Sequence, residues 1–210
     1  YVDGVGLLRA EFIVAQIGTH PRTFIDEGRP EEYTRQLAAG IREFCKAFAP
    51  RPVVYRLTDF KTNEYANLRG GAAYEASEEN PMIGYRGASR YIREPDIFKL
   101  ELDAIKEVRK EFRNLYVMVP FVRTPDELRA VKQLMAEQGL VRSEDFRLWM
   151  MCEVPSNAII LDKFIDVGID GRDAKVRLIL VSAPAGSGKS TLLKAWLAER
   201  TEAVAWLQAE

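Results

Sequence analysis

The sequence is poor in the features that disulfide frameworks, membrane spans and polyanion binding require. Its two cysteines, Cys45 and Cys152, are too few for a disulfide framework, which indicates a reducing cytoplasm. No apolar run approaches the roughly 20 residues of a bilayer span, and residues 1–11 carry charges where a signal peptide would be apolar. A net charge of −1 gives no reason to expect nucleic acid or a membrane surface as a partner.

The composition is that of an ordinary soluble globular protein, with 47% hydrophobic and 29% charged residues. A chain of 210 residues is long enough for one substantial core, or for one domain and a fragment. It begins with Tyr1 rather than Met, so we expect an internal piece of a longer protein.

The first 171 residues alternate strand-like and helix-like segments. The strand-like segments are short and rich in Val, Met, Phe and Tyr, as buried parallel strands are: 4–8, 53–57, 115–122 and 147–154. Apolar residues that recur every three or four positions predict two helices: Tyr33, Leu37, Ile41, Phe44 and Phe48 in one, and Phe98, Leu102, Ile105, Val108 and Phe112 in the other. This alternation indicates a parallel α/β fold, either a barrel or a doubly wound sheet.

A third helix has both of its ends marked in the sequence. Thr124 is its predicted N-cap, Pro125 its first helical position, and Glu127 completes a capping box. Gly139 ends it. A further short helix is expected over residues 156–165.

Charged residues follow several of the apolar segments at the point where each segment ends. Taken in chain order, these residues are Arg9, Glu11, Arg56, Asp59, Arg86 (after 80–84) and Glu153. In a parallel barrel, chemistry is located at the carboxyl ends of the strands. By residue type alone, an Arg near a strand end is more often a surface ion-pair partner and a Glu is often simply solvated. Both interpretations stay open at this point.

Six ordered motifs resemble the phosphoenolpyruvate synthase family (pyruvate, water dikinases) in its C-terminal pyruvate-binding barrel. They are GVGLLRAEFI at 4–13, GTHP at 18–21, YRLTDFKTNEYANL at 55–68, ENPMIGYRGA at 79–88, MVPFVRT at 118–124 and MMCEVPSNA at 150–158. Pyruvate phosphate dikinase and the phosphotransferase-system enzyme I share the Arg-Xaa-Glu and Asn-Pro patterns but differ around 58–67. The resemblance runs from residue 2 to residue 171.

The resemblance implies a (β/α)8 TIM barrel that turns ATP, pyruvate and water into AMP, phosphoenolpyruvate and phosphate. Arg9, Arg56 and Arg86 match the arginines that hold the phosphoryl group and the pyruvate oxygens, and Glu153 matches a Mg²⁺ ligand. A guanidinium group suits this task because it stays charged and binds phosphate or carboxylate bidentately. The residues that remain structural in this interpretation are His20, Asp59, Glu64, Arg90 and Cys152. The phosphohistidine of the family belongs to a separate domain.

The family pattern stops at residue 171, before the segments that supply a second magnesium carboxylate and the cysteine that protonates the enolate. The nucleotide-binding and phosphohistidine domains are missing as well. We count about five of the eight strands of a closed barrel, which leaves unpaired strand edges for a partner, such as a second copy of the chain. We therefore expect this chain to be inactive on its own.

The last forty residues begin a different pattern after a polar junction at 172–176. Residues 177–210 predict a P-loop fragment: a strand at 177–182, a Walker A loop APAGSGKS at 183–190, a helix at 191–199 and a strand at 203–207. The phosphates of a nucleotide such as ATP would be bound by Gly186, Gly188, Lys189, Ser190 and Thr191.

This segment resembles the ATPase module of bacterial transcription activators of the maltose-regulator type, on residues 182–190 and 205–207. No acidic second motif follows it, so we expect weak nucleotide binding at most and no hydrolysis. Two alternatives to the enzyme fragment stay open: a nucleotide-binding regulatory module with a vestigial scaffold, and a chimeric join with no activity of its own.

Overall fold

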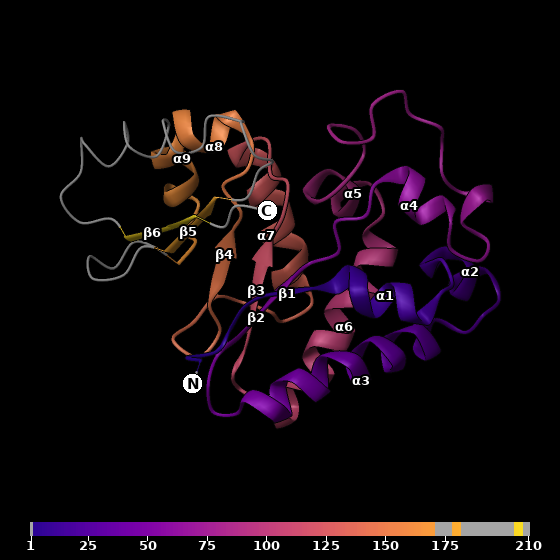
Figure 1. The fold of residues 1–210 in the computed structure, drawn as a ribbon, viewed down its shortest axis with the longest axis horizontal. Helices are drawn as coiled ribbons and strands as arrows, with labels where there is room; N and C mark the ends of the chain where they lie inside the picture. The colour runs from indigo at the N-terminus through magenta and orange to yellow at the C-terminus, as the bar shows by residue number, and fades with distance from the viewer. Residues whose placement is uncertain (1, 171–177, 182–203, 208–210) are drawn as a thin grey trace.

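The fold is built on one parallel sheet whose strands follow each other in chain order. The structure is a computed structural model that describes residues 2–170, 178–181 and 204–207. The sheet order is β1-β2-β3-β4, and all three pairings are parallel (Figure 1). Its strands are β1 (Val5–Arg9), β2 (Val53–Arg56), β3 (Leu115–Val119) and β4 (Leu148–Met150). The predicted α/β class with a parallel sheet is confirmed.

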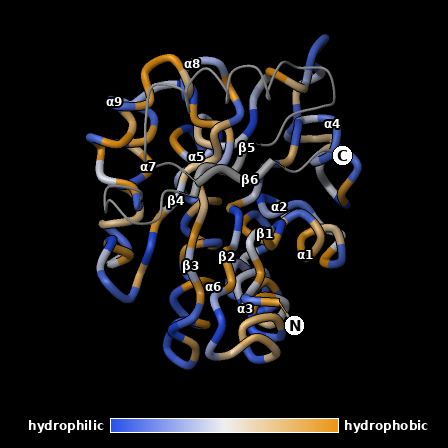
Figure 2. Tube along the Cα trace, turned by 60° about the vertical axis from the view of Figure 1, so that its left-hand side comes forward, coloured by the Kyte–Doolittle hydropathy of each residue, from blue (hydrophilic) through white to orange (hydrophobic). Residues whose placement is uncertain are grey.

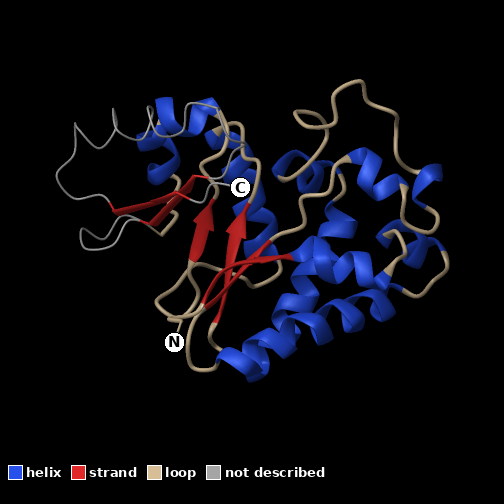
Figure 3. Ribbon diagram, in the orientation of Figure 1, coloured by secondary structure: helices blue, strands red, loops and turns tan. Residues whose placement is uncertain are grey.

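Helices connect the strands, as Figure 3 shows in blue. Between β1 and β2 lie α1 (Ala10–Ile17), α2 (Pro21–Asp26) and α3 (Pro30–Phe48). Between β2 and β3 lie α4 (Thr62–Ala66), the 3₁₀ turn η1 (Gly71–Ala73), α5 (Ala88–Arg93) and α6 (Pro95–Glu111). The remaining helices are α7 (Pro125–Glu137), α8 (Pro155–Ile159) and α9 (Leu161–Asp166).

The two faces of the sheet are buried differently, because successive side chains of a strand point to opposite faces. One face carries Val53, Tyr55, Leu115, Val117, Val119 and Leu148, which belong to the main core together with apolar residues of α3, α6, α7 and α9. The other face carries a small separate cluster of Val54, Met118 and Met151, with Leu7 and Trp149 packed against it. Figure 2 shows β3, at the centre of both, in hydrophobic colours.

Several predicted segments differ from the structure. The strand expected at 147–154 is limited to Leu148–Met150. The strand expected at 115–122 ends at Val119, because Pro120 has no N–H to continue the ladder. Residues 80–84 form turns rather than a strand that leads to Arg86. The helix expected at 156–165 is two helices separated at Ile160, whose φ of −120° and ψ of 40° are not helical.

The predicted start of α7 is confirmed with one change of partner. The Thr124 hydroxyl accepts the N–H of Glu127 at 3.1 Å, and Pro125 is the first helical residue. The Glu127 carboxylate, however, accepts the N–H of Arg123 at 2.6 Å rather than that of Thr124. Gly139 follows the helix with a φ of +78°, a left-handed conformation that glycine adopts without strain.

The C-terminal segment contributes a second, two-stranded sheet. It consists of β5 (Leu178–Val181) and β6 (Val204–Leu207), which pair in parallel with Leu178 opposite Val204. Both predicted strands of the P-loop fragment are therefore present. The junction 172–176, the Walker A loop at 183–190 and the helix expected at 191–199 lie outside the described residues, and so do all five predicted phosphate-binding residues. None of the described helices combines the length and apolarity that a membrane span requires.

Candidate active site

Arg9 and Arg56 are neighbours because of the register between β1 and β2. Each is the last residue of its strand, and the register places them opposite each other, with Met118 of β3 next in the same row. Paired residues of a parallel sheet project to the same face, so two guanidinium side chains leave the carboxyl edge of the sheet together. Two guanidinium groups so close together repel each other, so carboxylates beside them are needed to compensate their charge.

Arg56 is buried and contacts two carboxylates. Its Nη2 lies 3.0 Å from Oε2 of Glu11, and its Nη1 lies 3.8 Å from Oδ2 of Asp59. Nη1 also lies 3.7 Å from the thioether sulfur of Met151, in the small cluster on the second face of the sheet. Burial works against the charge of Arg56, but Glu11 and Asp59 outweigh it and raise its pKa.

Arg86 joins this cluster through Asp59. Its Nε and Nη2 donate to Oδ1 and Oδ2 of Asp59 at 2.9 and 2.7 Å, a bidentate pair, and its Nη1 donates to the Met82 carbonyl at 3.1 Å. The Asp59 side chain is 0% exposed. Asp59 therefore lies between Arg56 and Arg86 and compensates the charge of both. Assigning it a purely structural role understated its place in the site.

Glu153 lies at the same edge, after β4. Its Oε1 accepts the N–H of Phe121 at 2.6 Å, and its Oε2 has no hydrogen-bond or ion-pair partner among the described residues. Burial, with the charge of Asp59 adding to it, raises the pKa of Glu153 to about 7, although Phe121 N–H, Arg56 and Arg86 act in the opposite direction. The buried Asn157 amide holds the backbone here, because its Oδ1 accepts the N–H of Glu153 at 3.2 Å.

The backbone at Phe121 has a strained conformation that directs its N–H towards Glu153. Phe121 has a φ of +49°, which side chains other than glycine rarely adopt. In this conformation its N–H reaches Glu153, and the guanidinium carbons of Arg86 and Arg123 lie 4.5 and 4.6 Å from the centre of its ring. Gly87 allows the close approach, since a Cβ there would lie 2.6 Å from Cβ of Phe121.

The arrangement is suited to binding an anion. Arg9, Arg56 and Arg86 come from three separate parts of the chain to one edge of the sheet, beside Glu11, Asp59 and Glu153. Planar guanidinium groups bind carboxylate and phosphate with the same bidentate geometry. Burial also raises the pKa of Glu11, although the charge of Arg56 acts to lower it, and the buried Nε of Arg56 has no hydrogen-bond partner among the described residues. Such perturbed groups are concentrated at functional sites.

Comparison with known proteins agrees with this geometry. The family model described as "PEP-utilising enzyme, PEP-binding domain" matches residues 1–171. The chain belongs to this family.

Curated relatives of the PEP-utilising family are similar over most of this chain. A probable phosphoenolpyruvate synthase of Staphylothermus marinus is 49% identical over 175 residues, which cover 80% of this chain and 21% of the relative. The phosphoenolpyruvate synthase of Aeropyrum pernix is 49% identical over 176 residues, covering 80% and 21%. That of Escherichia coli is 44% identical over 189 residues, covering 78% and 24%. The chain thus spans about a fifth to a quarter of the length of these relatives.

Sequence reasoning selected four of the residues at this edge and passed over others. Arg9, Arg56, Arg86 and Glu153 were predicted as site residues, whereas Glu11 and Asp59 were noted at strand ends without a role in the site. Their signal was available: each acidic residue follows a strand-end arginine by two or three positions. No such local signal marks Phe121, Arg123 or Asn157, which act through contacts between distant segments.

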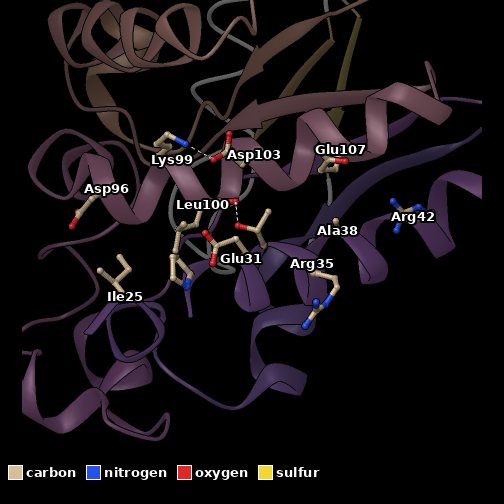
Figure 4. Close-up of a pocket in the computed structure, with 12 residues that line it drawn as sticks. Ile25, Glu31, Arg35, Ala38, Arg42, Asp96, Lys99, Leu100, Asp103 and Glu107 are labelled. Carbon is tan, nitrogen blue, oxygen red and sulfur yellow. Dashed lines mark hydrogen bonds and ion pairs between the residues drawn. The ribbon is translucent and has the colours of Figure 1, made fainter. Parts of the chain in front are cut away.

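A groove of the described structure lies away from this edge. Figure 4 shows this groove of about 650 Å³ between α3 and α6. It is lined by charges of both signs, which include Arg35, Arg42, Asp103 and Glu107, and by none of the predicted site residues. Lys99 and Asp103 already pair with each other there.

Proposed function

We propose that residues 1–171 form the pyruvate- and phosphoenolpyruvate-binding part of a phosphoenolpyruvate synthase. The observation that carries this proposal is the convergence of Arg56 and Arg86 on Asp59 at the carboxyl edge of a parallel sheet, where the strand register pairs Arg9 with Arg56. The full reaction of such an enzyme would turn ATP, pyruvate and water into AMP, phosphoenolpyruvate and phosphate. It would need a separate phosphohistidine domain, so we expect this chain alone to bind and not to turn over.

The roles of the arginines follow from their present partners. The guanidinium groups of Arg56 and Arg86 are held by Glu11 and Asp59 at 2.7 to 3.0 Å, in the geometry that phosphate or carboxylate oxygens would take. An anionic ligand would find them already desolvated and oriented. Phosphoryl transfer depends mainly on such positioning and on stabilisation of negative charge.

Glu153 is the residue we assign to Mg²⁺. Its Oε2 has no partner among the described residues, and a carboxylate that burial has made reluctant to ionise gains from a cation beside it. The ion would act as a Lewis acid on an enolate oxygen. Within the described part of the chain, no group of three or more His, Cys, Asp or Glu residues could hold a metal. In this proposal Glu153 would be one protein ligand of an ion that water and substrate oxygens otherwise surround.

The sheet is proposed to be part of a (β/α)8 barrel. Its four parallel strands, with helices against one face and a small apolar cluster on the other, are half of what a closed barrel needs. Five strands were expected, and the segment 80–84 accounts for the difference. Within the described residues, β1 and β4 each pair on one side only. A second copy of the chain is a candidate to cover these edges in a cytoplasmic setting.

The experiment is a calorimetric titration of the 210-residue chain with oxalate, an enolpyruvate mimic, in the presence of Mg²⁺. Arg56→Ala and Glu153→Gln are each expected to weaken binding about 10- to 100-fold, since each removes a charged contact to the ligand. The control is Arg42→Ala, which removes a surface arginine paired with Glu111 at 3.1 Å. Unchanged binding in Arg56→Ala, with the fold intact by circular dichroism, would refute the assignment.

Nucleotide binding by the C-terminal segment is a second candidate function. The parallel pairing of β5 with β6 supports it, because a P-loop connects parallel strands of this kind. The expected result is that a fluorescent ATP analogue binds the chain weakly and that Lys189→Ala abolishes this binding. An analogue that binds both proteins equally would leave no role for the loop.

A further inference from the structure

Glu101 is a buried carboxylate that the proposed function does not use. It lies in the middle of α6, is 4% exposed, and its Oε1 accepts three hydrogen bonds. These come from the Tyr55 hydroxyl at 2.8 Å, the Thr58 N–H at 2.9 Å and the Thr58 hydroxyl at 2.8 Å. Burying a carboxylate is unfavourable, and desolvation raises the pKa of Glu101 to about 7 although all three donors act to lower it. The cost of burying this carboxylate indicates that its hydrogen bonds have a specific role.

The segment that Glu101 holds is the turn that leads from β2 to Asp59. Three successive N–H groups of this turn donate to three different elements: Leu57 to the Met118 carbonyl of β3 at 3.0 Å, Thr58 to Glu101 of α6, and Asp59 to Glu11 of α1. The Thr58 carbonyl accepts the hydroxyl of a residue in α5, Tyr91. Four elements thus determine the backbone of the turn. Glu101 accepts one of these backbone hydrogen bonds and also accepts the Thr58 hydroxyl.

We propose that Glu101 is a positioning residue that fixes the Thr58–Asp59 turn and, through Asp59, sets the spacing of the Arg56 and Arg86 guanidinium groups. Its effect on ligand affinity rests on the proposed function, whereas its effect on the geometry of Asp59 does not. Glu101 is not itself a ligand-binding group, because the cavity beside it measures about 20 Å³. A space of that size accommodates a water molecule and not a substrate.

The chain offers a matched control for this inference. Glu101→Met removes the acceptor for both Thr58 donors and for the Tyr55 hydroxyl. Tyr55→Phe also removes one buried hydrogen bond to Glu101, that of the Tyr55 hydroxyl at 2.8 Å, but it leaves both hydrogen bonds from Thr58 to Glu101 in place. Glu101→Gln keeps an oxygen that can accept the same bonds and serves as the conservative variant.

The first measurement needs no ligand. The Nε–H of Arg86, which donates to Asp59 at 2.9 Å, and the Thr58 amide are followed by nuclear magnetic resonance and hydrogen exchange. We expect both to lose about tenfold or more in protection in Glu101→Met, and to stay near wild type in Tyr55→Phe and Glu101→Gln. Equal protection of the Arg86 Nε–H in Glu101→Met and wild type would overturn the inference.

A second pair of variants decides the matter if Glu101→Met does not fold. Thr58→Val and Tyr55→Phe each delete one hydroxyl donor to the same oxygen, Glu101 Oε1, at the same distance of 2.8 Å. Only Thr58→Val affects the turn, so only it should reduce protection of the Arg86 Nε–H. Equal effects in the two variants would show that Glu101 is merely part of the core.

The ligand arm separates this inference from the proposed function. Oxalate with Mg²⁺ is expected to bind Glu101→Met about tenfold or more weakly than Tyr55→Phe, because a small displacement of a binding group is enough to lose affinity. If wild type bound no oxalate while Arg86 Nε–H protection still depended on Glu101, the proposed function would fail and the positioning role would stand. If wild type bound oxalate and Glu101→Met bound it equally well, the proposed function would stand and the positioning role of Glu101 would fail.

Discussion

Two buried arginine clusters in this molecule have similar composition and different character. The site cluster consists of Arg9, Arg56, Arg86, Glu11, Asp59 and Glu153, at the carboxyl edge of the sheet. The clamp cluster consists of His20, Glu75, Arg90 and Glu94, with the rings of Tyr65 and Tyr85. Both bring arginines and carboxylates together largely out of solvent, and in both the carboxylates have donors nearby. They differ in whether those donors or the cost of burial has the larger effect on the carboxylate pKa.

The clamp cluster shows what structural use of an arginine looks like. Arg90 binds Glu75 bidentately at 2.7 and 2.8 Å, and also donates to Glu94 at 3.1 Å. Its guanidinium carbon lies 4.6 and 4.3 Å from the ring centres of Tyr65 and Tyr85. The buried His20, at the N-cap of α2, has its Nε2 at 3.1 Å from Glu75. These contacts join α2, α5 and the segment around residue 75.

The pKa of Glu75 in the clamp cluster shifts in the opposite direction to the pKa of Glu11 and of Glu153 in the site cluster. Burial alone would raise the pKa of Glu75, but hydrogen bonds from His20 and Arg90 outweigh it and lower the pKa. In the site cluster, burial prevails, and the pKa of Glu11 and of Glu153 is raised. A cluster built for stability compensates its charges, whereas a site that receives a charged ligand keeps some of them uncompensated.

The largest expected effect comes from deleting the central cation of the clamp cluster. Arg90→Met should lower the free energy of unfolding by about 3–5 kcal/mol, because Glu75 would stay buried with only His20 beside it. Arg86→Met should lower it less, since Asp59 would still lie 3.8 Å from Arg56. Urea denaturation of both variants measures the difference, and a larger loss in Arg86→Met would reverse the comparison.

A second prediction uses pH. Glu153 has a folded pKa of about 7 against an ordinary value of 4.5, so its contribution to stability is complete below 4.5 and is lost as pH rises towards 7 and above. Relative to wild type, Glu153→Gln should therefore gain up to about 3 kcal/mol between pH 5 and pH 8.

For Glu75→Gln we expect the opposite dependence of stability on pH in the same experiment. The pKa of Glu75 is lowered, so its contribution is present above 4.5 and is lost as pH falls through the folded pKa. Denaturation curves at several pH values should thus converge towards wild type at low pH for Glu75→Gln. If the free energies of unfolding of Glu153→Gln and Glu75→Gln, relative to wild type, changed with pH in the same direction, the two clusters would not differ as described. Glu101, with a pKa of about 7 as well, adds a background common to both.

The smallest effect should come from an arginine outside either cluster. Arg42 pairs with Glu111 at 3.1 Å on the surface, where solvent screens the interaction. Arg42→Ala should change the free energy of unfolding by less than about 0.5 kcal/mol. Thermal unfolding of Arg42→Ala and Arg90→Met under the same conditions compares the two losses of stability. A loss of several kcal/mol in Arg42→Ala would show that burial does not explain the difference between these arginines.

Local sequence patterns predicted the elements but not all of their ends. The period of apolar residues was sufficient for α3 and α6, and the cap at Thr124 for the start of α7, because these signals depend on neighbours within one turn. The prediction was wrong at 80–84, where proline and glycine turns carry Arg86 without a strand. It was also wrong at residue 160, where one expected helix is two.

The sequence by itself determined that Arg9 and Arg56 end strands and that acidic residues follow them closely, since these facts depend on chain order alone. Only the tertiary structure decided that Asp59 joins Arg56 to Arg86, that Phe121 presents its N–H to Glu153, and that Glu101 in α6 holds the turn after β2. The physical reason is that a strand or helix is encoded by neighbours in sequence. The partner of a buried charge is set by whichever distant segment the sheet register and the helix packing bring within about 3 Å.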